Sequence, residues 1–198
     1  MAQQEELSGD ISVKGKGLGD VTANAVSIKH GNAQDIKGTS VEITLGTAGA
    51  VQAEQVTLRQ ASAQAVKAQD VIIRQGAAVR LEAETVKATQ AALVLTQAEH
   101  VTTVGGQIGG LWAGQADLDQ SAAGVVIAPR GTSRVEQSAV GALLTGKAEV
   151  RNGVAGLIIA AKVEGDCQAL FGTRAALAFG AALGAVLGIV LRLTRREQ

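Results

Sequence analysis

The sequence predicts an all-β protein: a three-faced β-solenoid (β-helix) of about ten 15-residue coils, followed by a C-terminal transmembrane α-helix. Three observations lead to this prediction. Apolar residues recur every fifteen positions, large and small residues alternate in a fixed order within each repeat, and an uncharged apolar segment lies near the C-terminus.

The fifteen-residue repeat is the strongest of these signals. Its first position is β-branched in all but one of the first eight repeats: Ile11, Val26, Val41, Val56, Val71, Val86, Val101 and Ala116. Within a repeat, apolar or small residues occupy offsets 0, 2, 5, 7, 10 and 12. Residues i and i+2 of a strand point to the same side, so each group of five is a short strand followed by a corner. Three such groups close one coil.

Two other architectures fit this pattern less well. A four-faced coil needs similarity at twenty residues, but the position twenty after Ile11 is Gly31. An array of amphipathic helices needs a period of 3.6, which these segments lack. A narrow triangular core also needs small residues opposite large ones, and offset 12 is Ala or Gly in each of the first eight repeats.

The repeat divides the chain into five parts. Residues 1–10 are expected to form an N-terminal cap or tail, and residues 11–165 the solenoid. Residues 166–174 form a juxtamembrane linker, residues 175–191 the transmembrane helix, and residues 192–198 a basic tail.

Outward positions change from polar to apolar toward the C-terminus. Offset 11 ends in Trp112, Ile127, Ala142 and Leu157, offset 13 in Leu144 and Ile159, and offset 9 in Val125, Val140 and Ala155. An exposed apolar strip of this length is expected to be covered, either by another subunit or by the C-terminal segment folded back over it. Because the only Trp lies in it, we expect a subunit interface made by Trp112, Val125, Ile127, Val140, Ala142, Leu144, Leu157 and Ile159.

The segment AALAFGAALGAVLGIVL (175–191) is long enough for about 25 Å of helix, near the lower limit for crossing a bilayer. Small residues recur at a spacing of four and share one helix face: Gly172, Ala176, Gly180, Gly184 and Gly188. Such a face lets helices approach closely in lipid, so it predicts association between copies of this helix. The alternative is a cap helix that packs on the solenoid.

Orientation rests on two conflicting signals. Arginines after the span favour a cytoplasmic C-terminus, yet MAQQEELSGD has no signal-peptide character that would export the solenoid. We expect a single-pass protein of the cell membrane with a cytoplasmic solenoid. Cys167, just before the span, is either a small structural residue or a site of lipidation or an intersubunit disulfide.

The composition offers little for catalysis or for nucleic-acid binding. Lys plus Arg equals Asp plus Glu at 18 each, which removes the electrostatic basis for binding nucleic acid. His30 and His100 fall in distant coils, so no shared metal site is expected, and no nucleophile–base pair stands out. No cofactor and no small-molecule substrate are expected. The ladder of Lys14, Lys29, Arg59 and Arg74 is either a soluble face or a weak site for phosphate or lipid headgroups.

Stretches such as VIIRQGAAVRLEAETVKA (71–88) resemble the coils of bactofilin-like, polymer-forming β-solenoids. The resemblance covers residues 11–165 and lies in the alternation of valine, glycine and alanine within the repeats, not in a specific motif. The fifteen-residue coil and the C-terminal glycine-spaced segment depart from that family. The resemblance implies a cytoskeletal or scaffold protein that assembles near a membrane, and it implies no catalytic residues.

These observations favour a non-enzymatic, membrane-anchored scaffold protein. It would form a homo-oligomer through the C-terminal helix and the apolar solenoid face, with itself and the lipid bilayer as partners. The alternative is a membrane-tethered binding module whose faces recognise a polymer, a lipid surface or a partner protein.

Overall fold

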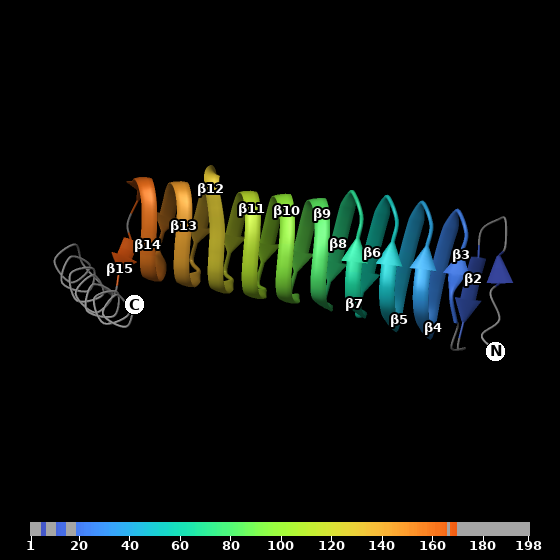
Figure 1. Ribbon diagram of the computed structural model, residues 1–198. Coiled ribbons are helices and arrows are strands. Elements are labelled where there is room, and N and C mark those ends of the chain that lie inside the picture. The colour runs from blue at the N-terminus through green and yellow to red at the C-terminus, as the bar shows by residue number, and fades with distance from the viewer. Residues whose placement is uncertain (1–4, 7–10, 15–18, 166, 170–198) are drawn as a thin grey trace, which may run out of the picture.

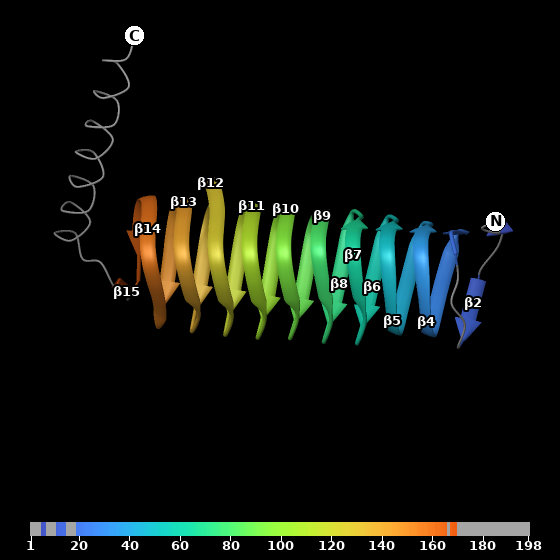
Figure 2. The same cartoon turned by 60° about the horizontal axis from the view of Figure 1, so that its bottom comes forward.

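The computed structural model describes residues 5–6, 11–14, 19–165 and 167–169, and it confirms an all-β parallel solenoid of about ten coils. The coils stack side by side along one axis, with the earliest coils (blue) at one end and the latest (orange) at the other (Figures 1 and 2). The described residues therefore form a rod whose length is set by the number of coils.

The strands form a single 15-stranded sheet that winds around the rod. The strands of 12 to 15 residues continue around two corners of the coil, so they are longer than the flat segments between corners. Their bounds are β1 (Glu5–Glu6), β2 (Ile11–Lys14), β3 (Val21–Thr22), β4 (Ala25–Lys37), β5 (Ser40–Gln52), β6 (Gln55–Arg59), β7 (Ser62–Lys67), β8 (Asp70–Arg74), β9 (Ala77–Thr89), β10 (Ala92–Val104), β11 (Gln107–Asp119), β12 (Ala122–Glu136), β13 (Ala139–Arg151), β14 (Gly153–Glu164) and β15 (Cys167–Ala169).

The register confirms the fifteen-residue repeat. Ile11 pairs with Val26, Val26 with Val41, and Val41 with Val56, so like residues lie one above another in parallel ladders. Pairing extends past the predicted solenoid at both ends, because β1 pairs with β3 and β15 pairs with β14.

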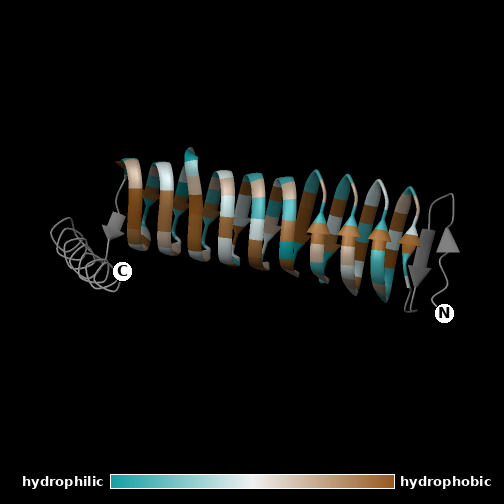
Figure 3. Ribbon diagram, in the orientation of Figure 1, coloured by the Kyte–Doolittle hydropathy of each residue, from teal (hydrophilic) through white to brown (hydrophobic). Residues whose placement is uncertain are grey.

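The core is a narrow column inside the coils. The large buried side chains come mainly from offsets 0, 2 and 10, and they include Ile28, Ile36, Ile43, Leu58 and Ile73. Opposite them, small residues such as Ala33, Ala48 and Ala63 fill offset 7. Apolar segments accordingly recur at the same level in successive coils (Figure 3). This is the size code that the sequence predicts, because three faces of large residues would not fit in so thin a prism.

One corner of the coil has a left-handed backbone. The corner residue has a φ between 47° and 64° in each coil from His30 to Asn152. The residues of this corner are His30, Leu45, Gln60, Gln75, Gln90, Gly105, Gln120, Gln137 and Asn152. Glycine is the usual residue for this conformation, yet this corner holds mostly glutamine. Stacked side-chain amides compensate, since Gln60 donates to Gln75 at 3.3 Å and Gln75 donates to Gln90 at 3.1 Å.

The repeat has one interruption, a two-residue insertion in β12. This strand has 15 residues, whereas β11 and β13 have 13. Trp112 pairs with Ile127, fifteen residues on, but Ala116 pairs with Ser133, seventeen residues on. The extra residues bulge at the corner around Pro129, and the spacing of fifteen resumes in β13 and β14.

The predicted transmembrane helix, residues 175–191, lies outside the described residues. Among the residues that the structure does describe, no helix is long and apolar enough to cross a membrane.

Candidate interaction surface

The most distinctive surface of the rod is an apolar ladder on one outer face of the C-terminal coils. Trp112 pairs with Ile127, Ile127 with Leu144, and Leu144 with Ile159. Three of these side chains are well exposed: 54% for Trp112, 40% for Leu144 and 55% for Ile159. The ladder begins abruptly, because the residue that pairs with Trp112 in the preceding coil is Gln97.

A second apolar ladder runs along the adjoining corner. Val125 pairs with Ala142, and Ala142 pairs with Leu157. Val125 and Leu157 are exposed, and the exposed Leu95 lies in the same column two coils earlier. We call the two ladders together the apolar ridge: Trp112, Val125, Ile127, Ala142, Leu144, Leu157 and Ile159.

One residue of the predicted interface is misplaced. Val140 is only 3% exposed and belongs to the core, as does Ala155, with which it pairs. The cause is the insertion in β12. A strict spacing of fifteen aligns Val140 with Val125, but the bulge makes Val140 pair with Ala123, an inward position. The same shift places Ala142 after Val125 and Leu144 after Ile127.

The insertion also shapes the surface beside Trp112. Pro129, Arg130 and Gly131 border a shallow depression of about 740 Å³, with Trp112 and Glu99 on its other sides. A Cβ at Gly131 would overlap the carbonyl oxygen of Gly114, so only glycine fits where the bulge rejoins the stack. The indole therefore lies beside the two-residue insertion in β12.

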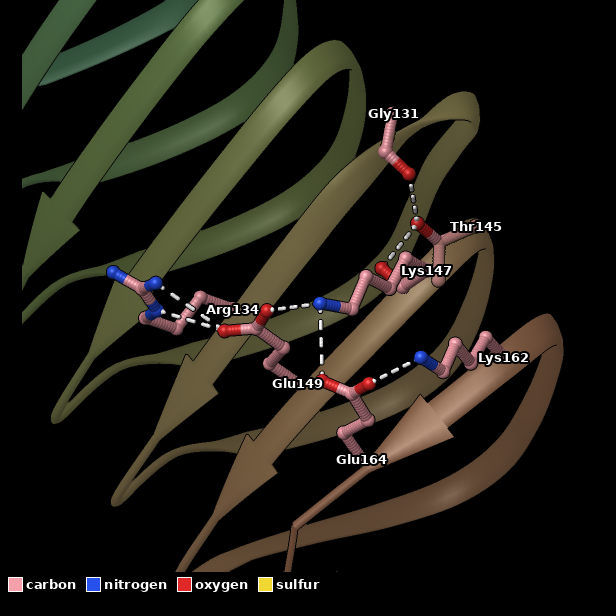
Figure 4. Close-up of polar contacts among 7 residues, drawn as sticks. All are labelled: Gly131, Arg134, Thr145, Lys147, Glu149, Lys162 and Glu164. Atoms are coloured by element: carbon pink, nitrogen blue, oxygen red, sulfur yellow. Dashed lines mark hydrogen bonds and ion pairs between the residues drawn. The ribbon is translucent and has the colours of Figure 1, made fainter.

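A different face of the same coils is charged (Figure 4). Lys147 Nζ lies 2.7 Å from Glu149 and 3.0 Å from Glu164. Arg134 extends the chain on one side, at 3.2 Å from Glu149, and Lys162 on the other, at 2.7 Å from Glu164. We call these five residues the charged ladder.

The charged ladder shifts the pKa values of its members. Hydrogen bonds from Lys147 and then Arg134 lower the pKa of Glu149. Hydrogen bonds from Lys162 and then Lys147 lower that of Glu164. Hydrogen bonds to Glu149 and then Glu164 raise the pKa of Lys147. The C-terminal coils thus have one hydrophilic, ion-paired face and an apolar ridge elsewhere on their circumference.

The third face of these coils carries an apolar groove of about 650 Å³. Its floor is a ladder of glycines, Gly109, Gly124, Gly141 and Gly156. Apolar side chains line the rest of it, and Gln107 is the only polar residue among those that border it. We call it the glycine groove.

The groove's floor is flat because any side chain there would collide with the coil before it. A Cβ at Gly124 would lie 2.5 Å from the carbonyl oxygen of Gly109, and a Cβ at Gly141 would lie 2.6 Å from that of Gly124. Sequence reasoning missed this groove, because the spacing of fifteen aligns Gly109 with Gly124 and Gly141 with Gly156 but places the two pairs at different offsets, and only the insertion in β12 brings them into one column.

Of the remaining candidates from the sequence, the structure describes the basic ladder and the histidines but not the C-terminal glycines. The helix-interface residues Gly172, Ala176, Gly180, Gly184 and Gly188 lie outside the described residues. The basic ladder is in register, since Lys29 and Arg59 both pair with Thr44, and Arg59 pairs with Arg74; Arg59 Nε also lies 3.9 Å from Glu42. Within the described part of the chain, no three His, Cys, Asp or Glu residues are grouped as metal ligands.

Comparison with known proteins adds no assignment. No protein-family model matches the chain, and no curated protein sequence or solved structure matches it either.

Proposed function

We propose that the protein is a non-enzymatic, membrane-anchored structural rod that assembles into a homo-oligomer. In this proposal residues 175–191 cross the cell membrane once, and the solenoid projects into the cytoplasm as a spacer or scaffold. The apolar ridge and the small-residue face of the C-terminal segment supply the contacts between subunits.

The observation that carries the proposal is the apolar ridge. It extends over four successive coils, contains no charged residue and exposes Trp112, Val125, Leu144, Leu157 and Ile159 to solvent. A contiguous apolar surface on a rod is the usual mark of a protein or membrane contact, and Trp is enriched where such contacts are strongest. The ridge runs parallel to the axis of the rod over these four coils, which suits lateral association of parallel copies.

The regularity of the coils supports a structural role. Repeated coils give a stiff object whose length and faces matter, and each coil is stabilised by its neighbours rather than by a unique site. The resemblance to bactofilin-like solenoids is consistent with this role. The small residues of the C-terminal segment support the second contact, because in lipid they allow close helix packing.

The first experiment measures the mass of the full-length protein in detergent by light scattering. Leu144→Glu places a charge in the centre of the apolar ridge, and Gln97→Glu adds the same charge in the column of Trp112, where that column is still polar. We expect a discrete oligomer for the natural protein and for Gln97→Glu, and a smaller species for Leu144→Glu.

A second pair of variants tests the C-terminal contact. Gly184→Leu fills the small-residue face, whereas Ala182→Leu adds the same bulk on the opposite side of a helix. Loss of the oligomer with Gly184→Leu alone assigns assembly to this segment, and loss with Leu144→Glu alone assigns it to the ridge. A monomeric natural protein would contradict self-assembly and favour the tethered binding module.

A further inference from the structure

The glycine groove raises the question of what covers it. It lies on a different face from the ridge, and its two ends expose Val94 and Val154, at 57% and 42%. The same face is not apolar throughout. Toward the N-terminus it continues as a polar depression of about 620 Å³, whose lining includes Asn32, Thr47, Ser62 and Gln64. The apolar part is therefore limited to the coils between Ala92 and Gly156.

The chain leaves the solenoid at the end of this groove. Strand β15 pairs with the first residues of β14, with Gln168 opposite Val154 and Ala169 opposite Ala155. The described chain thus ends opposite Ala155, the neighbour of Gly156, which lines the groove's last coil. Five residues, 170–174, separate this point from the apolar segment 175–191.

The lengths agree. Five coils border the groove, which is about 24 Å at roughly 4.8 Å per coil. Seventeen residues make about 25 Å of helix. A helix that turns back from Ala169 would reach the N-terminal end of the groove as its apolar residues end, and its arginines (Arg192, Arg195 and Arg196) would follow over the polar part of the face.

The glycine groove and the segment 175–191 are also chemically complementary. A floor of glycines lets a helix approach the sheet closely, and the segment has its own small residues at a spacing of four. We propose that residues 175–191 dock as a helix in the glycine groove when no bilayer is present, antiparallel to the direction of coil stacking. The segment is then a retractable anchor: it is shielded in water and released into a membrane.

Docking in water does not depend on the proposed function, and only the release step rests on it. The test uses the full-length chain with Cys167→Ser and two new cysteines. Residue 180 is about 7.5 Å along a helix from residue 175, which places it near the coil of Ala139. Ala139→Cys is exposed beside the groove and is paired with Gly180→Cys. The matched control pairs Gly180→Cys with Thr47→Cys, an exposed position in the same column, six coils earlier.

We expect mild oxidation in water to form an intramolecular disulfide in the first pair at least about tenfold faster than in the control, because docking raises the effective concentration. Phosphatidylcholine vesicles should abolish this difference. Adding Ala122→Glu, a charge at the groove, should also abolish the disulfide while the β-sheet circular dichroism and the melting temperature are retained.

Three results would overturn docking: equal rates in both pairs, disulfides only between chains, or no disulfide in either pair. Disulfides between chains would make a second copy the occupant of the groove. If the disulfide forms in water and vesicles do not change its rate, docking in the groove stands and the membrane anchor is contradicted. Docking and membrane anchoring can therefore fail separately.

Discussion

Two threonine hydroxyls in the core are buried without a partner. Thr96 and Thr103 are fully buried, and neither Oγ1 atom forms a hydrogen bond. Other buried hydroxyls of the core are satisfied: Ser121 Oγ accepts a bond from the backbone N–H of Gly106, and Ser133 donates to Thr145. An unpaired buried hydroxyl costs stability, so these two positions are weak points of the stack.

Thr96→Val and Thr103→Val should each raise the free energy of unfolding by about 1 kcal/mol, because valine keeps the shape and removes the unpaired hydroxyl. Urea denaturation of each variant measures this. The matched control is Thr145→Val, which removes a hydroxyl bonded to Ser133 and near the carbonyl oxygen of Gly131, and should lower stability by about 1 kcal/mol. A loss of stability with all three variants would contradict the assignment.

Glycines of the rod differ in what they tolerate. Gly105 interrupts the glutamine corner, and a Cβ there would make only an ordinary contact, 3.7 Å from Gln90. Gly105→Gln should change stability by less than about 1 kcal/mol, since the left-handed backbone costs what the new amide stacking returns. Gly131→Ala should cost about 1–3 kcal/mol, because its Cβ has no room. Thermal melts measure the change in melting temperature for each variant. A larger drop for Gly105→Gln than for Gly131→Ala would contradict this ranking.

At the scale of single elements, β13 and β14 are joined by side chains as well as by the backbone. The charged ladder bridges β12, β13 and β14, with Lys147 between Glu149 and Glu164. The last described coil also has less of its core covered, since Val163 is 48% exposed. The ion pairs therefore hold the strands with the least apolar support.

The charged ladder predicts the pH range in which these strands are stable. Since the folded pKa values of Glu149 and Glu164 lie below the ordinary 4.5, their contribution is present above pH 4.5 and is lost as pH falls through the folded values. Since the pKa of Lys147 lies above 10.5, its contribution is present below pH 10.5 and is lost as pH rises through the folded value. The protection factors for amide exchange in β13 and β14, which correct for the intrinsic pH dependence of exchange, should therefore be highest between these limits.

Glu149→Gln tests this assignment. At neutral pH it should speed amide exchange in β13 and β14 relative to the natural protein, and in acid the two proteins should converge. A matched change away from the network is Glu99→Gln, an exposed residue for which no change in exchange is expected. A difference between Glu149→Gln and the natural protein that persists at low pH would contradict the ionic origin of the effect.

At the scale of the whole molecule, the rod is a sum of interchangeable coils. Val56, Val71 and Val86 stack in one ladder, and Arg59 stacks on Arg74. Each coil contacts only its two neighbours, so stability should depend on the number of coils and on their interfaces. Removing one whole coil should leave a shorter rod with all ladders intact.

Deletion of residues 71–85 removes one repeat and joins Asp70 to Val86, which occupies the same place in the ladder as Val71. We expect a folded protein that is about 4.8 Å shorter by small-angle scattering and less stable to denaturant. Deletion of residues 71–78, about half a coil, moves every later side chain to the wrong face and should not fold. A folded half-coil deletion would contradict strict register as the basis of the fold.

The sequence by itself determined the class of fold, the length of the coil and the inward positions, because each follows from periodicity and side-chain size. Ile43, for example, lies at an inward offset of a three-faced coil, and it is buried in the structure. Its pairing with Ile28 follows from the spacing of fifteen. The change of the outer faces from polar to apolar is also visible in the letters alone, since outward positions alternate with inward ones.

Only the tertiary structure decided the phase of the C-terminal coils, the left-handed corner and the glycine groove. A two-residue bulge at Pro129 moves Val140 inward, and the place of the bulge depends on how β12 stacks between its neighbours. Glutamine is not a residue type that predicts a positive φ, so the sequence gives no sign of the left-handed backbone at Gln60. The amide stacking that accompanies this backbone requires Gln60 and Gln75 to lie in adjacent coils. The groove exists because glycines from four coils meet in one column, a relation that arises from folding and not from any single repeat.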